Sequence, residues 1–489
     1  MNAVFKRHKS ALVLLAILAF ALSLRLQYFV GPGLNDDVDY FYSARAVSRG
    51  DFGSLYGGSI NAIRSMVTAP IAFFFRLFGR TDKFVAEIWP LLCSLGTVVL
   101  TYFLGKGLFS QRTGLLAAFV LSFFPVDVAF STQIVPTTQV VFFFTLTLFL
   151  LFRSLTKKRA PGKFLFLAGI SGGLGYLANI MMVFVLFFSV GLFLLMYCRG
   201  FRRLLRAAIP IIVGFLLVFL VEACFMFAFT GNPLHRLQVI HETEKMIGTN
   251  TAMEYYPKVM GTITNPDYSA HQGNLGLHFF AFVAGAAFLT AFRRRKGAIF
   301  LALTFLLIMS YFQFGIMTST LKPIAKWVRY LIIFGPIFSI SIAEFFRSLL
   351  PWEKLTAPLA ALVLLFATIP YLEGTTRAYN EQLEPFRETA EYLDSLETDS
   401  PVYADGTAAA FFSIELGFGR MIRVFDKKTE PENVAGSYVV LNGSRGTSEN
   451  QEMRGYLPEF ARNPPGNFRL VRKIEGKFFS PEIYYAEKT

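Results

Sequence analysis

Long apolar runs, separated by short and mostly basic polar segments, dominate the pattern of hydrophobic and polar positions along the chain. A run of about 20 apolar residues is long enough to cross the roughly 30 Å hydrocarbon core of a bilayer as a helix. We therefore predict about 11 membrane-spanning helices. They cover residues 11–30, 84–104, 114–130, 135–151, 164–178, 180–197, 207–229, 277–292, 298–317, 330–346 and 355–372.

The basic clusters between the runs support this count. The apolar tract from 164 to 197 is continuous, and we divide it near Asn179 because one helix of about 34 residues would overshoot the bilayer. The clusters at 157–159, 199–206 and 293–296 then fall on the same side as the basic N-terminus, as expected for loops that face the cytoplasm. The pattern predicts a cytoplasmic N-terminus and an extracytoplasmic C-terminus.

The segment between the first two predicted spans, 31–83, carries the acidic pair Asp36 and Asp37 and then an amphipathic pattern that ends at Gly50. Apolar residues at i, i+3 and i+4 predict a short interfacial helix, which Asp37 can cap. A second half-apolar stretch, which contains Arg64, is expected to lie along the outer surface. Carboxylates at a membrane border are functional candidates, so we interpret this segment as the active-site loop.

The polar tail from 375 to 489 predicts a domain of its own, after a transmembrane domain that covers 1–374 and includes a large outer loop at 230–276. Its alternating patterns predict helices at 386–396 and 408–416, and strands at 401–404, 421–425, 438–441, 468–474 and 483–486. The predicted fold class is an α-helical polytopic membrane protein with a small C-terminal α/β extracytoplasmic domain.

Composition agrees with a multi-pass protein of the inner, or cytoplasmic, membrane. The chain is 54% hydrophobic and 16% charged, with a mean hydropathy of +0.48. The net charge of +14 comes from clusters between apolar runs, so it reports topology and not a nucleic-acid partner. Cys93, Cys198 and Cys224 lie within or beside apolar runs, which argues against a disulfide framework or a cysteine metal site.

The predicted topology gathers carboxylates and cations at the outer face. Asp36 and Asp37 are the catalytic candidates, because a carboxylate can act as general base on a hydroxyl. They can equally cap a helix or bind a divalent metal, so a metal cofactor stays open. The candidates for binding a donor phosphate are the cations Arg64, Lys322, Lys326 and Arg329.

The same cations have an alternative role as interfacial anchors, since long basic side chains snorkel toward lipid headgroups. Two further acids are supporting candidates on this face. Asp127 lies at the outer end of the third predicted span, and Glu222 lies in the outer half of the seventh, where it can pair with a cation.

Several of these positions resemble a known family pattern. The pattern consists of an Arg near the end of the first helix, an acidic pair, a Tyr three residues on and a later Gly. Here it corresponds to Arg25-Leu26, Asp36-Asp37, Tyr40, Ala44 and Gly50-Asp51-Phe52, and the stretches Gly105-Lys106-Gly107-Leu108-Phe109 and Arg329-Tyr330-Leu331 are also similar. The family comprises the polytopic glycosyltransferases that use lipid-phosphate-linked sugars, including protein O-mannosyltransferases and the bacterial lipid A aminoarabinose transferase.

The resemblance implies a hexosyl- or pentosyltransferase that inverts the sugar on the outer face. Asp36 would deprotonate the acceptor, basic residues would bind the polyprenyl phosphate, and Arg25 and Tyr40 would support the site. The implied partners are a polyprenyl-phosphate-linked sugar, an acceptor lipid, glycan or protein, and membrane lipids. One departure stands out, because many relatives have an acid near the start of the fourth span, where this chain has Pro136-Thr137-Thr138. Either Asp127 substitutes, or the acceptor or metal chemistry differs.

Two other functions fit a polytopic basic chain. A transporter or flippase for lipid-linked sugars would place ionisable residues at mid-membrane and would show two pseudo-symmetric halves. The charges here lie mostly at the borders and no halves are evident, which favours the enzyme. A catalytically inactive scaffold whose outer domain binds a partner is the other alternative, because the acid at Thr137 is missing.

Overall fold

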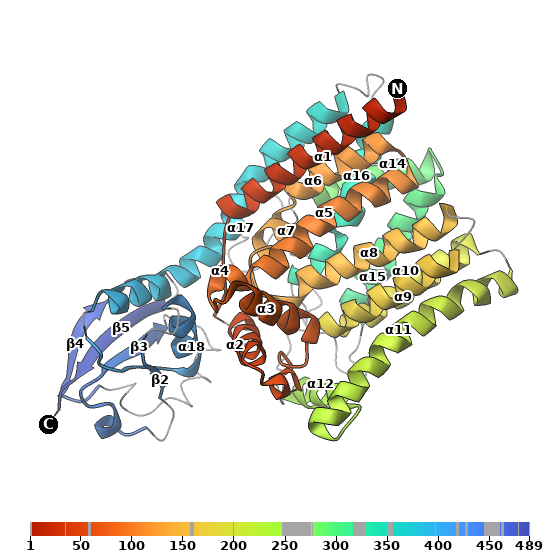
Figure 1. Ribbon diagram of the computed structural model, residues 1–489. Coiled ribbons are helices and arrows are strands. Elements are labelled where there is room, and N and C mark those ends of the chain that lie inside the picture. The colour runs from red at the N-terminus through yellow and green to blue at the C-terminus, as the bar shows by residue number, and fades with distance from the viewer. Residues whose placement is uncertain are drawn as a thin grey trace.

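The computed structural model describes residues 2–34, 36–56, 60–156, 161–198, 200–246, 275, 277–315, 328–349, 356–396, 398–416, 420–425, 429–444, 460, 464–477 and 479–488. Within these residues, long helices form a bundle and a small sheet lies beyond one end of it (Figure 1). Seven of the helices in the described part are long and apolar enough to cross a membrane. The predicted fold class is confirmed, whereas the count of 11 spans stays a prediction.

The predicted apolar runs fall largely on the helices of the bundle. The run at 114–130 is shared between α6 and the short α7, and the runs at 84–104 and 330–346 begin on the short α4 (Lys83–Ala86) and η4 (Val328–Phe334). The helices are α1 (Asn2–Gln27), α5 (Ile88–Leu108), α6 (Gln111–Ser122), α7 (Pro125–Phe130), α8 (Pro136–Thr156), α9 (Pro161–Ala178), α10 (Met181–Tyr197), α11 (Phe201–Thr230), α14 (His278–Ala291), α15 (Lys296–Phe314), α16 (Gly335–Leu349) and α17 (Thr356–Ser395). The tract that we divided near Asn179 breaks there, and the Asn179 side chain accepts a hydrogen bond from the Met181 N–H at 3.0 Å.

Short helices gather at the end of the bundle that also carries the sheet, which we call the site end (Figure 1). They are α2 (Asp36–Ser48), η1 (Phe52–Tyr56), α3 (Ser65–Phe78), α4 (Lys83–Ala86), α12 (His235–Met246) and η4 (Val328–Phe334). The interfacial helix predicted after the acidic pair is α2, and its apolar face, with Val38, Phe41 and Val47, is buried. We call the opposite end, where α1 begins and α15 follows the basic turn at 293–296, the basic end.

The tail forms the small α/β domain that the sequence predicts. Its elements are β1 (Val402–Ala404), α18 (Gly406–Glu415), β2 (Ile422–Val424), η5 (Pro431–Val434), β3 (Tyr438–Ser444), β4 (Phe468–Lys473) and β5 (Phe479–Ala486). The strand order is β2-β1-β3-β5-β4, with β1 parallel to both neighbours and β5 antiparallel to both of its own. Helix α17 runs without interruption from the bundle into this domain, across position 375 where we expected the domain to begin.

The domain packs against α2, the helix that carries the acidic pair. Val30, just after α1, belongs to the same buried apolar cluster as Phe386 of α17 and Phe412 of α18. Helix α18 contacts α2, and Glu415 at its end forms an ion pair with Lys83 of α4. The domain therefore packs against α2, at the site end of the bundle.

Candidate active site

Asp36 lies in the first turn of α2, and its side chain is partly open to solvent. Its carboxylate is 31% exposed. Its Oδ2 accepts a hydrogen bond from Arg329 Nη2 at 3.1 Å, and its Oδ1 accepts one from Asn61 Nδ2 at 3.2 Å. Arg329 belongs to η4, nearly 300 residues away in the sequence, so the fold brings together two groups that sequence analysis had selected separately.

Arg64 and Tyr40 lie beside this pair. Arg64 precedes α3, and its Nη1 donates to the Tyr40 hydroxyl and, at 3.1 Å, to Asn61 Oδ1. The Tyr40 hydroxyl in turn donates to Asn61 Oδ1 at 3.0 Å. Three of the predicted site residues, Asp36, Tyr40 and Arg64, therefore meet around one buried asparagine. Sequence reasoning missed Asn61, since a single amide in a loop carries no spacing signal.

The electrostatics of the cluster keep Asp36 ionised. Burial raises the pKa of its carboxyl, but the charges of Arg329 and Arg64 and the hydrogen bonds from Asn61 and Arg329 outweigh burial, so the pKa lies below its ordinary value. Burial raises the pKa of Tyr40 well above its ordinary value, so this hydroxyl stays neutral. The site therefore holds one carboxylate next to two guanidinium groups.

Asp37 points elsewhere, although it follows Asp36 directly. It is buried, and its Oδ2 accepts hydrogen bonds from the Gly33 N–H at 3.1 Å and the Ile134 N–H at 2.9 Å. The side chain thus ties the loop before α2 to the loop after α7 and does not cap its own helix. Burial raises the pKa of Asp37 to about 6, even though the two N–H groups lower it.

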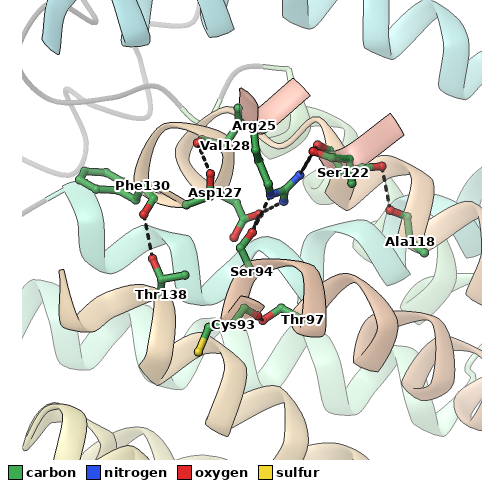
Figure 2. A network of polar contacts seen from close by, with 12 residues as sticks. Arg25, Cys93, Ser94, Thr97, Ala118, Ser122, Asp127, Val128, Phe130 and Thr138 are labelled. Carbon is green, nitrogen blue, oxygen red and sulfur yellow. Dashed lines mark hydrogen bonds and ion pairs between the residues drawn. The ribbon is translucent and has the colours of Figure 1, made fainter. Parts of the chain in front are cut away.

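Arg25 and Asp127 form an ion pair that is closed to solvent, shown in Figure 2. Arg25 also donates to Ser94 Oγ at 2.8 Å and to the carbonyls of Ala21 and Ser122, while Ser94 donates to Asp127 Oδ2 at 2.8 Å. The network joins α1, α5, α6 and α7. Asp127 therefore belongs to a buried contact between helices, whereas the sequence suggested a supporting role with the carboxylates and cations of the outer face.

Glu222 pairs with a cation that sequence analysis did not select. Arg236 of α12 donates to Glu222 Oε1 at 2.9 Å, and its guanidinium lies over the Tyr176 ring, 4.9 Å from the centroid. Arg236 also donates to the Ile63 carbonyl, directly before Arg64. This buried pair fastens α11 and α12 to the segment that presents Arg64.

Two predicted phosphate-binding residues, Lys322 and Lys326, lie outside the described residues. In the part of the chain that the structure describes, no three His, Cys, Asp or Glu side chains gather as metal ligands would. The surroundings of Asp36 favour an anion over a metal, because two guanidinium groups already face it. The arrangement can bind a phosphate with Arg64 and Arg329 while it presents a carboxylate next to that phosphate.

Comparison with known proteins supports the resemblance seen in the sequence. Residues 65–226 match the model of a family described as dolichyl-phosphate-mannose-protein mannosyltransferase. A search of curated proteins returns no match.

The fold has solved counterparts. The structure of ArnT from Cupriavidus metallidurans bound to undecaprenyl phosphate aligns with a TM-score of 0.64 over 96% of this chain and 97% of that one, at 12% identity. The Archaeoglobus fulgidus oligosaccharyltransferase in its apo form aligns with a TM-score of 0.54 over 99% of this chain and 75% of that one, at 12% identity. The chain thus shares its fold with these two proteins, and the resemblance to this class of enzymes is confirmed by the family model and by the fold.

Proposed function

We propose that this chain is a membrane glycosyltransferase that moves a hexosyl or pentosyl unit from a polyprenyl-phosphate donor to an acceptor hydroxyl or phosphate. The observation that carries the proposal is the partly exposed Asp36 carboxylate, 3.1 Å from Arg329 and linked through Asn61 to Arg64. The family match over residues 65–226 and the fold shared with ArnT support the same class of reaction.

Each charged residue of the site has one role in the proposed reaction. Asp36 accepts the proton of the acceptor hydroxyl as the acceptor oxygen attacks the anomeric carbon. The bond from that carbon to the donor phosphate breaks, and its electron pair stays on the phosphate oxygen, where Arg64 and Arg329 stabilise the charge. Attack from the side opposite the phosphate inverts the anomeric carbon. A phosphate leaves without prior protonation, so one base suffices where glycoside hydrolysis typically uses two carboxyl groups.

The cations that bind the phosphate also set the strength of the base. In the structure, Arg329 and Arg64 keep the pKa of Asp36 below its ordinary value, and a carboxylate of low pKa is a weak base. A donor phosphate on these arginines offsets their charge, and the burial of Asp36 then raises its pKa. Asp36 therefore becomes a stronger base when the donor is bound.

Asp37 and Asp127 have different proposed roles. Asp37, hydrogen-bonded to two backbone N–H groups, positions the loop before α2, and Asp127 holds the end of α1 through Arg25. Neither is required as a second acid in the transfer described above.

The orientation follows from the distribution of charge. We propose that the basic end, with the cluster at 293–296, faces the cytoplasm and that the site end and the C-terminal domain lie outside the cytoplasmic membrane. The donor is then a polyprenyl-phosphate-linked sugar within the membrane, the same class of lipid phosphate as the undecaprenyl phosphate bound to ArnT. The acceptor is a lipid, glycan or protein that reaches the site from outside. The fold shared with ArnT and with the oligosaccharyltransferase also favours an enzyme over a flippase.

Mass spectrometry of membrane lipids and envelope glycans tests this function. Cells that lack the gene should lose one sugar-bearing species, and the wild-type gene should restore it whereas Asp36→Asn, expressed at the same level, should not. Identical spectra with and without the gene, or full restoration by Asp36→Asn, would contradict the proposal.

A further inference from the structure

Asn61 lies between the carboxylates and the cation of the proposed active site. Its Nδ2 donates to Asp36 Oδ1 at 3.2 Å and to Asp39 Oδ2 at 2.9 Å. Its Oδ1 accepts from the Tyr40 hydroxyl at 3.0 Å and from Arg64 Nη1 at 3.1 Å. The amide nitrogen and the amide oxygen are therefore both hydrogen-bonded, and these partners determine the orientation of the amide.

The two sides of this amide have opposite polarity. Carboxylates accept hydrogen bonds and a guanidinium only donates them, so only the Nδ2 group can face Asp36 and Asp39, and only Oδ1 can face Arg64. The side chain is buried, with 6% of its surface exposed, so solvent does not compete for these bonds. Among the residues that the structure describes, Arg64 reaches Asp36 through this amide and not by a direct hydrogen bond.

The Arg64 guanidinium and the Asp36 carboxylate both contact Asn61, so only this one amide lies between them. Without it, the two opposite charges would attract each other into direct contact. A bidentate ion pair between Arg64 and Asp36 would take up the carboxylate oxygens that accept the acceptor's proton and the N–H groups that bind the donor phosphate. Arg329 already occupies one oxygen of Asp36. A second direct ion pair would close the site.

We propose that Asn61 is a positioning residue that separates the base Asp36 from the phosphate-binding Arg64 and so keeps both available to substrates. The role rests on the proposed function, because it assumes that Arg64 binds the donor phosphate. The charged and titratable groups that act on Asp36 are Arg329 from η4, Arg64 ahead of α3, and Asp37 and Tyr40 of α2 itself. Asp39 of α2 shares the Asn61 amide with Asp36.

A double-mutant cycle on the purified full-length protein tests the separation. Binding of undecaprenyl phosphate is measured for the wild type, Asn61→Ala, Asp36→Asn and the double variant. Asn61→Ala should weaken binding about tenfold, because Arg64 then pairs with Asp36. In the Asp36→Asn background one of the two competing carboxylates is gone, so the same change should weaken binding less. With Asp36→Asn and Asp39→Asn combined, it should alter binding by less than about twofold.

A second variant reverses the polarity of the amide. Asn61→Asp keeps the size of the side chain but puts a carboxylate next to Arg64, so binding should weaken at least as much as in Asn61→Ala, and Asp36→Asn should not restore it. Asn232→Ala is the matched control, because Asn232 is a partly exposed amide that also bonds on both sides: its Nδ2 donates to Gln238 at 3.0 Å and its Oδ1 accepts from the Leu234 N–H at 2.9 Å. It should bind like the wild type.

The outcomes separate the two proposals. An equal loss from Asn61→Ala in both backgrounds, or no loss in either, would show that Asn61 does not separate the charges and would overturn this inference while the proposed function stands. If the wild type does not bind undecaprenyl phosphate, or if Arg64→Ala binds it as tightly as the wild type, the donor site itself is wrong and both proposals fall.

Discussion

The two ends of the bundle each hold a carboxylate among arginines. The two carboxylates differ in how many hydrogen bonds they already accept. At the basic end, Glu344 is fully buried, and it accepts hydrogen bonds from Arg295 at 2.7 Å, Arg347 at 2.8 Å, Thr113 at 2.8 Å and Ser348 at 3.2 Å. An ionised carboxylate offers about four lone-pair sites, so Glu344 has no capacity left for another partner.

At the site end, Asp36 is partly exposed and accepts from two side chains, Arg329 and Asn61. The remaining lone pairs can meet a proton from a substrate. Residue types alone do not separate the two clusters, since both combine one acid with arginines. The number of hydrogen bonds that each carboxylate accepts, and its exposure to solvent, do separate them. These properties indicate that Glu344 joins helices at the basic end and favour a catalytic role for Asp36 at the site end.

The largest expected effect is on turnover at the site end. Asp36→Asn should lower turnover about 10²- to 10⁴-fold, because the amide cannot accept the proton of the acceptor. Its thermal unfolding midpoint should stay close to that of the wild type. The matched control is Asp39→Asn, which changes an exposed carboxylate one helical turn away that also contacts Asn61. Equal losses of turnover in the two variants would remove the distinction that we draw for Asp36.

At the basic end the same chemical change should act on stability. Glu344→Gln leaves the charges of Arg295 and Arg347 without their carboxylate and should lower the free energy of unfolding by about 2–3 kcal/mol. This is below the cost of a fully buried pair, because both arginines reach solvent in part. Denaturant titration in detergent measures the loss. A large drop in turnover per folded molecule would show that the basic end also takes part in catalysis.

Arg329 should affect donor use more than acceptor use. Arg329→Ala should raise the donor concentration at half-saturation about 10- to 100-fold, since a charge-assisted contact to the phosphate is lost. The value for the acceptor should not change. Arg76→Ala provides a control, because Arg76 lies at the same end and donates to the Ser48 carbonyl at 2.8 Å. Unchanged half-saturation for the donor would argue against a phosphate-binding Arg329.

The smallest effect concerns Asp37 and depends on pH. Its pKa in the folded chain, about 6, lies above the ordinary value of 3.8, so its contribution to stability is fully present below about pH 4 and is lost as the pH rises through 6. Both N–H groups donate to the same oxygen, so the amide oxygen of Asp37→Asn can accept both.

The difference in unfolding free energy between Asp37→Asn and the wild type should therefore grow in favour of the variant by about 2 kcal/mol between pH 4.5 and pH 7.5. Turnover should stay within about threefold of the wild type. Unfolding titrations at the two pH values measure the change. A difference that does not vary with pH would contradict the assigned titration of Asp37.

The sequence predicted the elements better than it predicted the contacts. Apolar length and periodicity locate the helices, including the break near Asn179, and alternating patterns locate the five strands in the described part of the tail. Asp36 and Arg329 could be selected because an acid or a cation beside a membrane span is unusual. Those signals depend on local composition, which the amino-acid sequence alone provides.

Pairing across the fold could not be predicted in this way. Asp127 was expected to support the site at the outer face, but its partner Arg25 lies 102 residues earlier, and no local pattern links the two. Likewise, Asn61 and Arg236 are ordinary polar residues until the fold places them against Asp36 and Glu222. Whether a carboxylate is saturated is a property of such contacts, so the two ends of the bundle look alike in the sequence.

The central claim is that Asp36 performs chemistry and supports neither the fold nor the binding of the donor. It is tested most directly by measuring undecaprenyl phosphate binding and sugar transfer on the same preparation of purified Asp36→Asn. We expect binding at least as tight as that of the wild type, because a negative charge next to the phosphate is removed, together with a loss of transfer of about 100-fold or more. Transfer close to the wild-type rate, or a loss of binding in proportion to the loss of transfer, would contradict the claim.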